Sequence, residues 1–146
     1  MTDIRRKSQW RPALAAYIDE CRSTPFAWGS HDCALFAAGA VEAMTGADLA
    51  RGLRGKYRDA RSATRVIKKA GFGSLGDLVA ARLPEVAPGL ADRGDLAIIR
   101  DDDGMAALAV VVGAEVVAAR EIGVSFVSRA RVERAFHVPF GDLPNG

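Results

Sequence analysis

The stretch FAWGSHDCALFAA, residues 26–38, places Cys33 where a polar, turn-forming loop becomes an apolar helix. Asp32 is a candidate N-cap for this helix, and Gly46 follows its expected end. The start of a helix leaves backbone N–H groups without partners and carries about half a positive charge, so it lowers the pKa of a thiol placed there. Because the thiolate is the nucleophilic form, Cys33 is the candidate nucleophile of the chain.

Outward from this stretch, helices are expected in the first half of the chain and strands in the second. Apolar spacing and capping residues predict helices over 10–22, 32–44, 59–70 and 74–83. Short apolar runs separated by turn residues predict strands over 96–99, 107–112, 115–119 and 124–127, with a closing strand over 135–138. This order predicts an α+β fold in which N-terminal helices pack on a C-terminal antiparallel sheet.

The composition indicates one globular unit. With 146 residues, 49% of them hydrophobic, a single domain over 1–146 is expected, with short flexible ends near 1–8 and 140–146. The net charge of +2 argues against nucleic-acid binding, and the basic stretch over 51–65 predicts a solvated helical face. No uninterrupted apolar run follows the polar N-terminus, so we expect synthesis in the cytoplasm and no membrane insertion.

No cofactor or metal ion is expected. Cys21 and Cys33 form neither a disulfide scaffold nor a paired metal motif, and Cys21 lies on the apolar face of the first helix, where a small buried side chain is expected. The glycines at 71–73 lack the context of a phosphate-binding loop. The acidic run at 101–104 lacks the alternating ligands of a calcium loop and predicts a hairpin turn.

A catalytic cysteine needs a base, and the chain has two histidines. His31 is two residues before Cys33, a spacing that normally points the two side chains apart. His137 lies near the C-terminus and is the first candidate base if its strand runs beside the helix start. The residues also fit an inert Cys33 buried in its helix, with His31 in the loop and His137 at a strand edge.

Four motifs resemble those of the NlpC/P60 cysteine peptidases. They are Trp28-Gly29, Asp32-Cys33 at a helix start, Gly94-Asp95-Leu96 opening a strand, and LAVVVG over 108–113. The resemblance spans roughly residues 26–119 and implies a papain-like core. The resemblance also implies the activity of that family, in which a cysteine nucleophile cleaves peptidoglycan stem peptides.

The chain departs from this family at the base. The position that matches the family's catalytic histidine is Ala107, and the third, polar residue of the family's triad falls near Ala118 or Ala119. An alanine cannot accept a proton, so Cys33 is the one member of the family's catalytic triad that the chain retains. Loss of general-base catalysis typically costs a factor of about 10² to 10⁴ in rate.

Small NlpC/P60-like chains of this kind resemble those encoded among phage and gene-transfer-agent tail genes. The resemblance implies a structural or adaptor protein of a tail tip or hub with a degenerate catalytic site. Its partners would be other tail or hub proteins and peptidoglycan, its place would be the virion tail, and Phe26 and Trp28 are the candidate binding residues.

The alternative is an active cysteine peptidase that cleaves stem peptides during cell-wall penetration. In this hypothesis Cys33 is the nucleophile, Asp32 caps its helix, and His137 is the base, with His31 as the second choice. Backbone N–H groups at the helix start would then help to hold the oxyanion.

Overall fold

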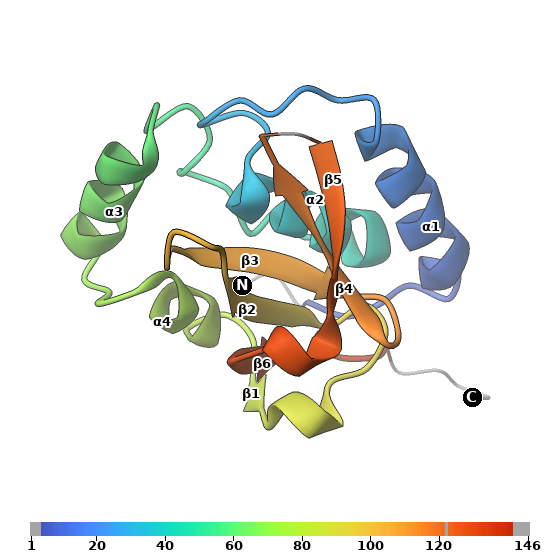
Figure 1. The fold of residues 1–146 in the computed structure, drawn as a ribbon. Helices are drawn as coiled ribbons and strands as arrows, with labels where there is room; N and C mark the ends of the chain where they lie inside the picture. The colour runs from blue at the N-terminus through green and yellow to red at the C-terminus, as the bar shows by residue number, and fades with distance from the viewer. Residues whose placement is uncertain (1–3, 122, 142–146) are drawn as a thin grey trace.

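The computed structural model describes residues 4–121 and 123–141, and the chain order of its elements is helices first and strands second (Figure 1). Its α-helices are α1 (Trp10–Cys21), α2 (Cys33–Thr45), α3 (Ala60–Lys69) and α4 (Leu75–Ala80). Its strands are β1 (Glu85–Val86), β2 (Leu96–Arg100), β3 (Ala106–Val111), β4 (Glu115–Arg120), β5 (Gly123–Ser128) and β6 (Arg134–Phe136). Two short 3-10 helices, Pro88–Leu90 and Arg129–Arg131, join the strands.

The strands form one antiparallel sheet in the order β1-β6-β2-β3-β4-β5. Strands β2 to β5 are the predicted meander. The closing strand β6 does not continue it but returns to β2, where Phe136 is paired with Leu96. Strand β1 was not predicted from the sequence because two residues are too short to show alternation. The α+β prediction is confirmed.

The two faces of the sheet bury different side chains. One face packs against α1 and α2 through large residues such as Phe36, Met44 and Phe136. The other face carries mainly small side chains, and Val127 of β5 and Val132 pack against it. Figure 1 shows β5 crossing in front of the central strands. Small residues are needed there because Val127 and Val132 come close to this face.

Helix α2 lies at the centre of the fold because it is apolar nearly all round. Seven of its thirteen residues are buried, and its alanines and Gly39 let neighbours approach closely. A Cβ on Gly39 would lie 2.1 Å from the Tyr17 hydroxyl of α1. That hydroxyl donates a hydrogen bond of 2.8 Å to the carbonyl oxygen of Phe36. Cys21 is buried on the inner face of α1, as predicted.

The predicted flexible ends are partly wrong. Residues 1–3 and 142–146 of those ends lie outside the described part of the chain. Within it, Arg6 is buried, donates its backbone N–H to Pro139 and forms a bridge with Phe140. The physical reason is that the Arg6 side chain forms hydrogen bonds with Val138, Arg93 and Asp95. Among residues 4–121 and 123–141, no helix is both long and apolar enough to cross a membrane.

Candidate functional site

Helix α2 begins at Cys33, and the preceding loop is built to hold that start in place. The buried Asp32 carboxylate accepts hydrogen bonds from the backbone N–H of Leu35 at 3.0 Å and of Gly29 at 2.9 Å. Gly29 has φ +84°, and a Cβ there would lie 2.3 Å from the carbonyl oxygen of Tyr57. The helix cap predicted at Asp32 is therefore present, and a glycine is required three residues before it.

The Cys33 thiol is half-buried, and its surroundings oppose ionisation. Burial raises its pKa above the usual 9.0, and the nearby Asp32 carboxylate raises it further. Backbone hydrogen bonds from Leu108 and Ala34, together with the charge of Arg120, act in the opposite direction but are outweighed. At neutral pH the thiol is therefore protonated, contrary to the expectation from the helix start alone.

The thiol borders a small groove of about 120 Å³ at the start of β3 and the end of β4. The two aromatic residues of the preceding loop form one wall, with ring centroids 5.3 Å apart. Ala107 and Ala119 also line the groove. The complete lining is Phe26, Trp28, Cys33, Asp101, Asp103, Met105, Ala106, Ala107, Ala119, Arg120 and Glu121. Phe26 and Trp28 thus border the groove that contains Cys33.

Ala107 lies beside Cys33, where the family resemblance places the base. Cys33 packs against the same hydrophobic cluster as Ala107 and Ala118, both of which are buried. The arrangement therefore contains a cysteine at a helix start and, at the two matching strand positions, only methyl groups. A methyl group cannot accept a proton, so neither of these two strand positions supplies the base that the resemblance implies.

His31 does not join the groove. Its backbone forms a bridge with Ala27, and its ring lies edge-on to Phe36, with centroids 6.2 Å apart. Burial lowers the pKa of His31 below its usual value. Of the described residues that line the two cavities containing Cys33, none is a histidine.

His137 lies at the other end of α2. Its Nδ1 is 3.0 Å from Asp95 Oδ1, and its ring packs against Phe140. The neighbouring Gly94 has φ +92°, and a Cβ there would lie 3.0 Å from the Met44 sulfur, in the last turn of α2. Met44 is eleven positions after Cys33, a distance of about 16 Å along the helix axis. The structure therefore does not bring His137 and Cys33 together.

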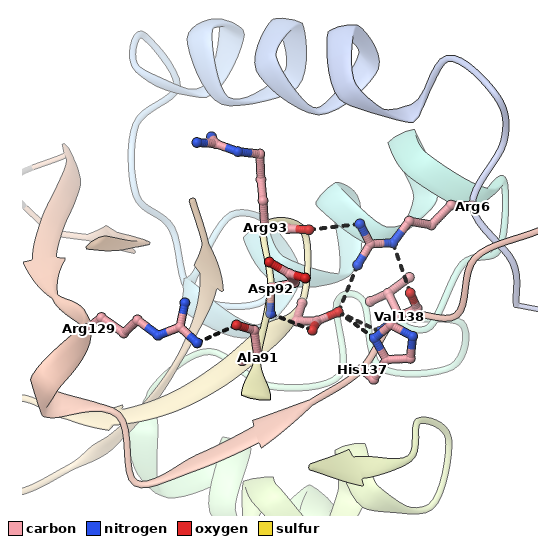
Figure 2. Close-up of polar contacts among 8 residues, drawn as sticks. Arg6, Ala91, Asp92, Arg93, Arg129, His137 and Val138 are labelled. Carbon is pink, nitrogen blue, oxygen red and sulfur yellow. Dashed lines mark hydrogen bonds and ion pairs between the residues drawn. The ribbon is translucent and has the colours of Figure 1, made fainter. Parts of the chain in front are cut away.

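Instead, His137 belongs to a buried polar network around Asp95 (Figure 2). Asp95 Oδ1 accepts hydrogen bonds from Arg6 Nη2 at 2.7 Å and from the backbone N–H of Val138 at 2.9 Å, and Oδ2 accepts one from the N–H of Asp92 at 2.8 Å. Arg6 also donates to the carbonyl oxygens of Val138 and Arg93. Burial lowers the pKa of Arg6, and Asp95 opposes this effect.

Sequence reasoning did not find this network, although the Gly94-Asp95-Leu96 motif marked one of its members. The missing signal is Arg6, which sits in a basic tripeptide that reads as a solvated end. Nearby, Arg129 donates to the carbonyl oxygen of Ala91, so a second arginine also ties backbone carbonyls at this edge of the sheet (Figure 2). The Asp95 network holds together the segment before α1, the start of β2 and the segment after β6.

Tyr57 is a second residue that the sequence did not single out. Burial and its hydrogen bond to the Asp32 carboxylate raise the pKa of this hydroxyl. Its ring lies edge-on to Trp28, with centroids 6.4 Å apart. Tyr57 therefore joins the capped start of α2 to the loop over 46–59.

A solved structure of known family shares this fold. The crystal structure of the NlpC/p60 domain of the peptidoglycan hydrolase SagA superposes with a TM-score of 0.52 at 18% sequence identity. The match covers 86% of this chain and 97% of that domain. At this identity the similarity shows the fold alone, and the predicted NlpC/P60-like fold is confirmed.

The comparison of sequences gives a family. No curated protein matches the chain. One family model, described as "Domain of unknown function (DUF6950)", matches residues 5–138. Because this match includes nearly all of the sequence, the chain belongs to the DUF6950 family, whose fold here is that of the NlpC/P60 domains.

Proposed function

We propose that this protein is a non-hydrolytic NlpC/P60-like module that serves as a structural or adaptor component of a phage-type tail tip or hub. The observation that carries the proposal is Ala107, which lies in the groove beside Cys33 where the resemblance places a histidine. The protonated state of the Cys33 thiol supports the same conclusion. Without a histidine at position 107, the site would bind its ligand and release it unchanged.

The tail context follows from the resemblance of small NlpC/P60-like chains to those encoded among tail genes. In this proposal the partners are other tail or hub proteins, and peptidoglycan is a ligand. The loop aromatics Phe26 and Trp28 would contribute the contact surface, because both rings border the groove and are half-buried. Large aromatic side chains of this kind carry much of the binding energy at protein interfaces.

The test separates a binding role from a catalytic one. Purified protein is incubated with peptidoglycan, and the soluble fraction is analysed for released muropeptides. We expect no release, and we expect Cys33→Ala to assemble into particles and support infection as the parent chain does. Release of muropeptides that Cys33→Ala and iodoacetamide both abolish would instead establish the cysteine peptidase.

A matched pair of variants tests the partner surface. Trp28→Ala removes a ring from the groove, whereas Leu90→Ala removes an exposed apolar side chain from the far 3-10 turn. We expect Trp28→Ala to reduce incorporation into particles and Leu90→Ala to leave it unchanged. Equal incorporation of both folded variants would contradict a role for the loop aromatics.

A further inference from the structure

Two adjoining apolar cavities, each of about 360 Å³, lie between α2 and the α3–α4 hairpin. They share four lining residues, Ala34, Leu53, Leu75 and Leu78. The first extends to Leu96 and Leu108 of the sheet, and the second extends to Cys33. Each volume lies in the range of about 300 to 1,000 Å³ that is usual for small-molecule sites.

Helix α3 covers the second cavity without filling it. None of the residues of α3 is buried, although its apolar side chains gather on one face. That face contributes Ala63, Val66 and Ile67 to the cavity wall. A helix normally buries such a face against the core, so α3 here leaves space for an apolar occupant.

The surroundings of the cavities are strongly basic. Residues 51–69 contain eight lysines and arginines and a single acidic residue, Asp59, in a chain whose net charge is only +2. Arg51 and Arg82 line the first cavity and Lys68 lines the second. Among the described residues, these three side chains form no direct ion pair. Positive charge without a fixed partner beside an apolar cavity favours an anionic ligand.

The lining also distinguishes an alkyl chain from a peptide. Of the described residues that line the first cavity, only Arg51 and Arg82 have polar side chains. A peptide segment would bring N–H and C=O groups, each of which costs free energy when it is buried without a partner. An alkyl chain has no such groups.

We propose that these cavities bind a single-chain anionic amphiphile, with its alkyl chain along the shared apolar wall and its phosphate or carboxylate at Arg51 and Arg82. The second cavity shares Cys33 and Trp28 with the groove that contains Ala107. The proposed binding needs no proton transfer, and it does not depend on the tail role. In this proposal the basic stretch over 51–69 attracts an anionic ligand, whereas the sequence alone predicts only a solvated helical face.

Dodecyl phosphate, kept below its micelle concentration, is the probe. Binding is measured by isothermal titration calorimetry, with tryptophan fluorescence as a second readout because Trp28, one of the two tryptophans, lines the second cavity. We expect saturable binding of one molecule per chain. Dodecanol, which lacks the charge, should bind at least about tenfold more weakly, and inorganic phosphate should not bind. Absence of dodecyl phosphate binding, or equal binding of dodecanol, would overturn the proposal.

Variants test the two halves of the site. Arg82→Gln should weaken dodecyl phosphate binding about tenfold, whereas the exposed Arg22→Gln, far along the chain, should not change it. Leu53→Trp should fill the wall that both cavities share and abolish binding. If Leu53→Trp does not fold, Arg82→Gln still tests the proposal, because Arg82 is exposed. Unchanged binding of dodecyl phosphate by Arg82→Gln would refute the proposed head-group contact.

A second copy of the chain is the competing occupant. Sedimentation velocity of the protein without amphiphile tests it, and we expect a monomer over the concentrations used for calorimetry. Self-association that Leu53→Trp and Arg82→Gln both remove would overturn the proposal in favour of a contact between copies.

Discussion

Arg6 and Asp95 are 89 positions apart in the chain, and Arg6 Nη2 lies 2.7 Å from Asp95 Oδ1 with both side chains almost fully excluded from solvent. The Arg6 guanidinium also lies 4.2 Å from the ring centroid of Trp10 and 4.3 Å from that of Phe140. The pair thus joins the segment before α1, the start of β2 and the segment after β6. One buried ion pair therefore holds the segment around Arg6 against the segment around Val138.

Asp95→Asn should lower the free energy of unfolding by about 3 kcal/mol, because it leaves the buried Arg6 charge uncompensated. The measurement is urea denaturation at neutral pH. Asp19→Asn is the matched control, since Asp19 forms an exposed ion pair with Arg22 at 3.7 Å and should cost less than about 0.5 kcal/mol. Equal effects of the two substitutions would mean that the Arg6–Asp95 pair does not hold the ends.

Much of the fold could be predicted from the sequence because periodicity and caps are local signals. The Asp32 cap, the apolar α2 and the hairpin at 101–104 all follow from residues close together in the chain. The return of β6 to β2 could not be predicted, since Phe136 and Leu96 are 40 positions apart and nothing local specifies their pairing. Long-range register is set by packing of the whole sheet.

The candidate site also has features that the sequence could predict and features that it could not. Cys33 and the alanine at 107 could be located from motifs, and the structure brings both to one hydrophobic cluster. The protonated thiol could not be predicted, because the helix start favours the thiolate and only the surrounding fold reveals that burial is the larger effect. The partner of His137 is Asp95, from the motif that opens β2.

The alkaline stability of the protein should depend on Cys33. Its pKa is raised above 9.0 in the folded state, so the folded chain keeps a proton that the unfolded chain loses as the pH rises above 9. The contribution of Cys33 to the free energy of unfolding is therefore fully present below pH 9, and it is lost as the pH rises through the folded pKa. Between pH 8 and pH 10, Cys33→Ala should lose less unfolding free energy than the parent. Cys21 and the tyrosines remain in both chains, so parallel pH curves would contradict the raised pKa of Cys33.

Gly39→Ala should destabilise the protein by about 1 to 3 kcal/mol, because the new Cβ would lie 2.1 Å from the Tyr17 hydroxyl. Thermal denaturation followed by circular dichroism measures the effect. Gly89→Ala is the control, since nothing lies within 4 Å of a Cβ there and its φ is not in the left-handed region. Adding Tyr17→Phe to Gly39→Ala should recover part of the loss by removing the clashing oxygen, and no recovery would place the strain elsewhere.

Backbone amides of α3 should exchange with solvent deuterium far faster than those of α2. None of the residues of α3 is buried, whereas α2 is enclosed by α1 and the sheet, and local opening is easiest where little apolar surface must be exposed. The N-cap at Asp59 is the main local support of α3, because its side chain accepts from the backbone N–H of Ser62 at 2.7 Å. Asp59→Ala should therefore speed exchange across residues 60–69 and leave α2 unchanged. If α3 were held by packing against the cavity wall, the substitution would have no such local effect.

Dodecyl phosphate should slow the same amides in the parent chain, since an alkyl chain would supply the apolar contacts that Val66 and Ile67 lack.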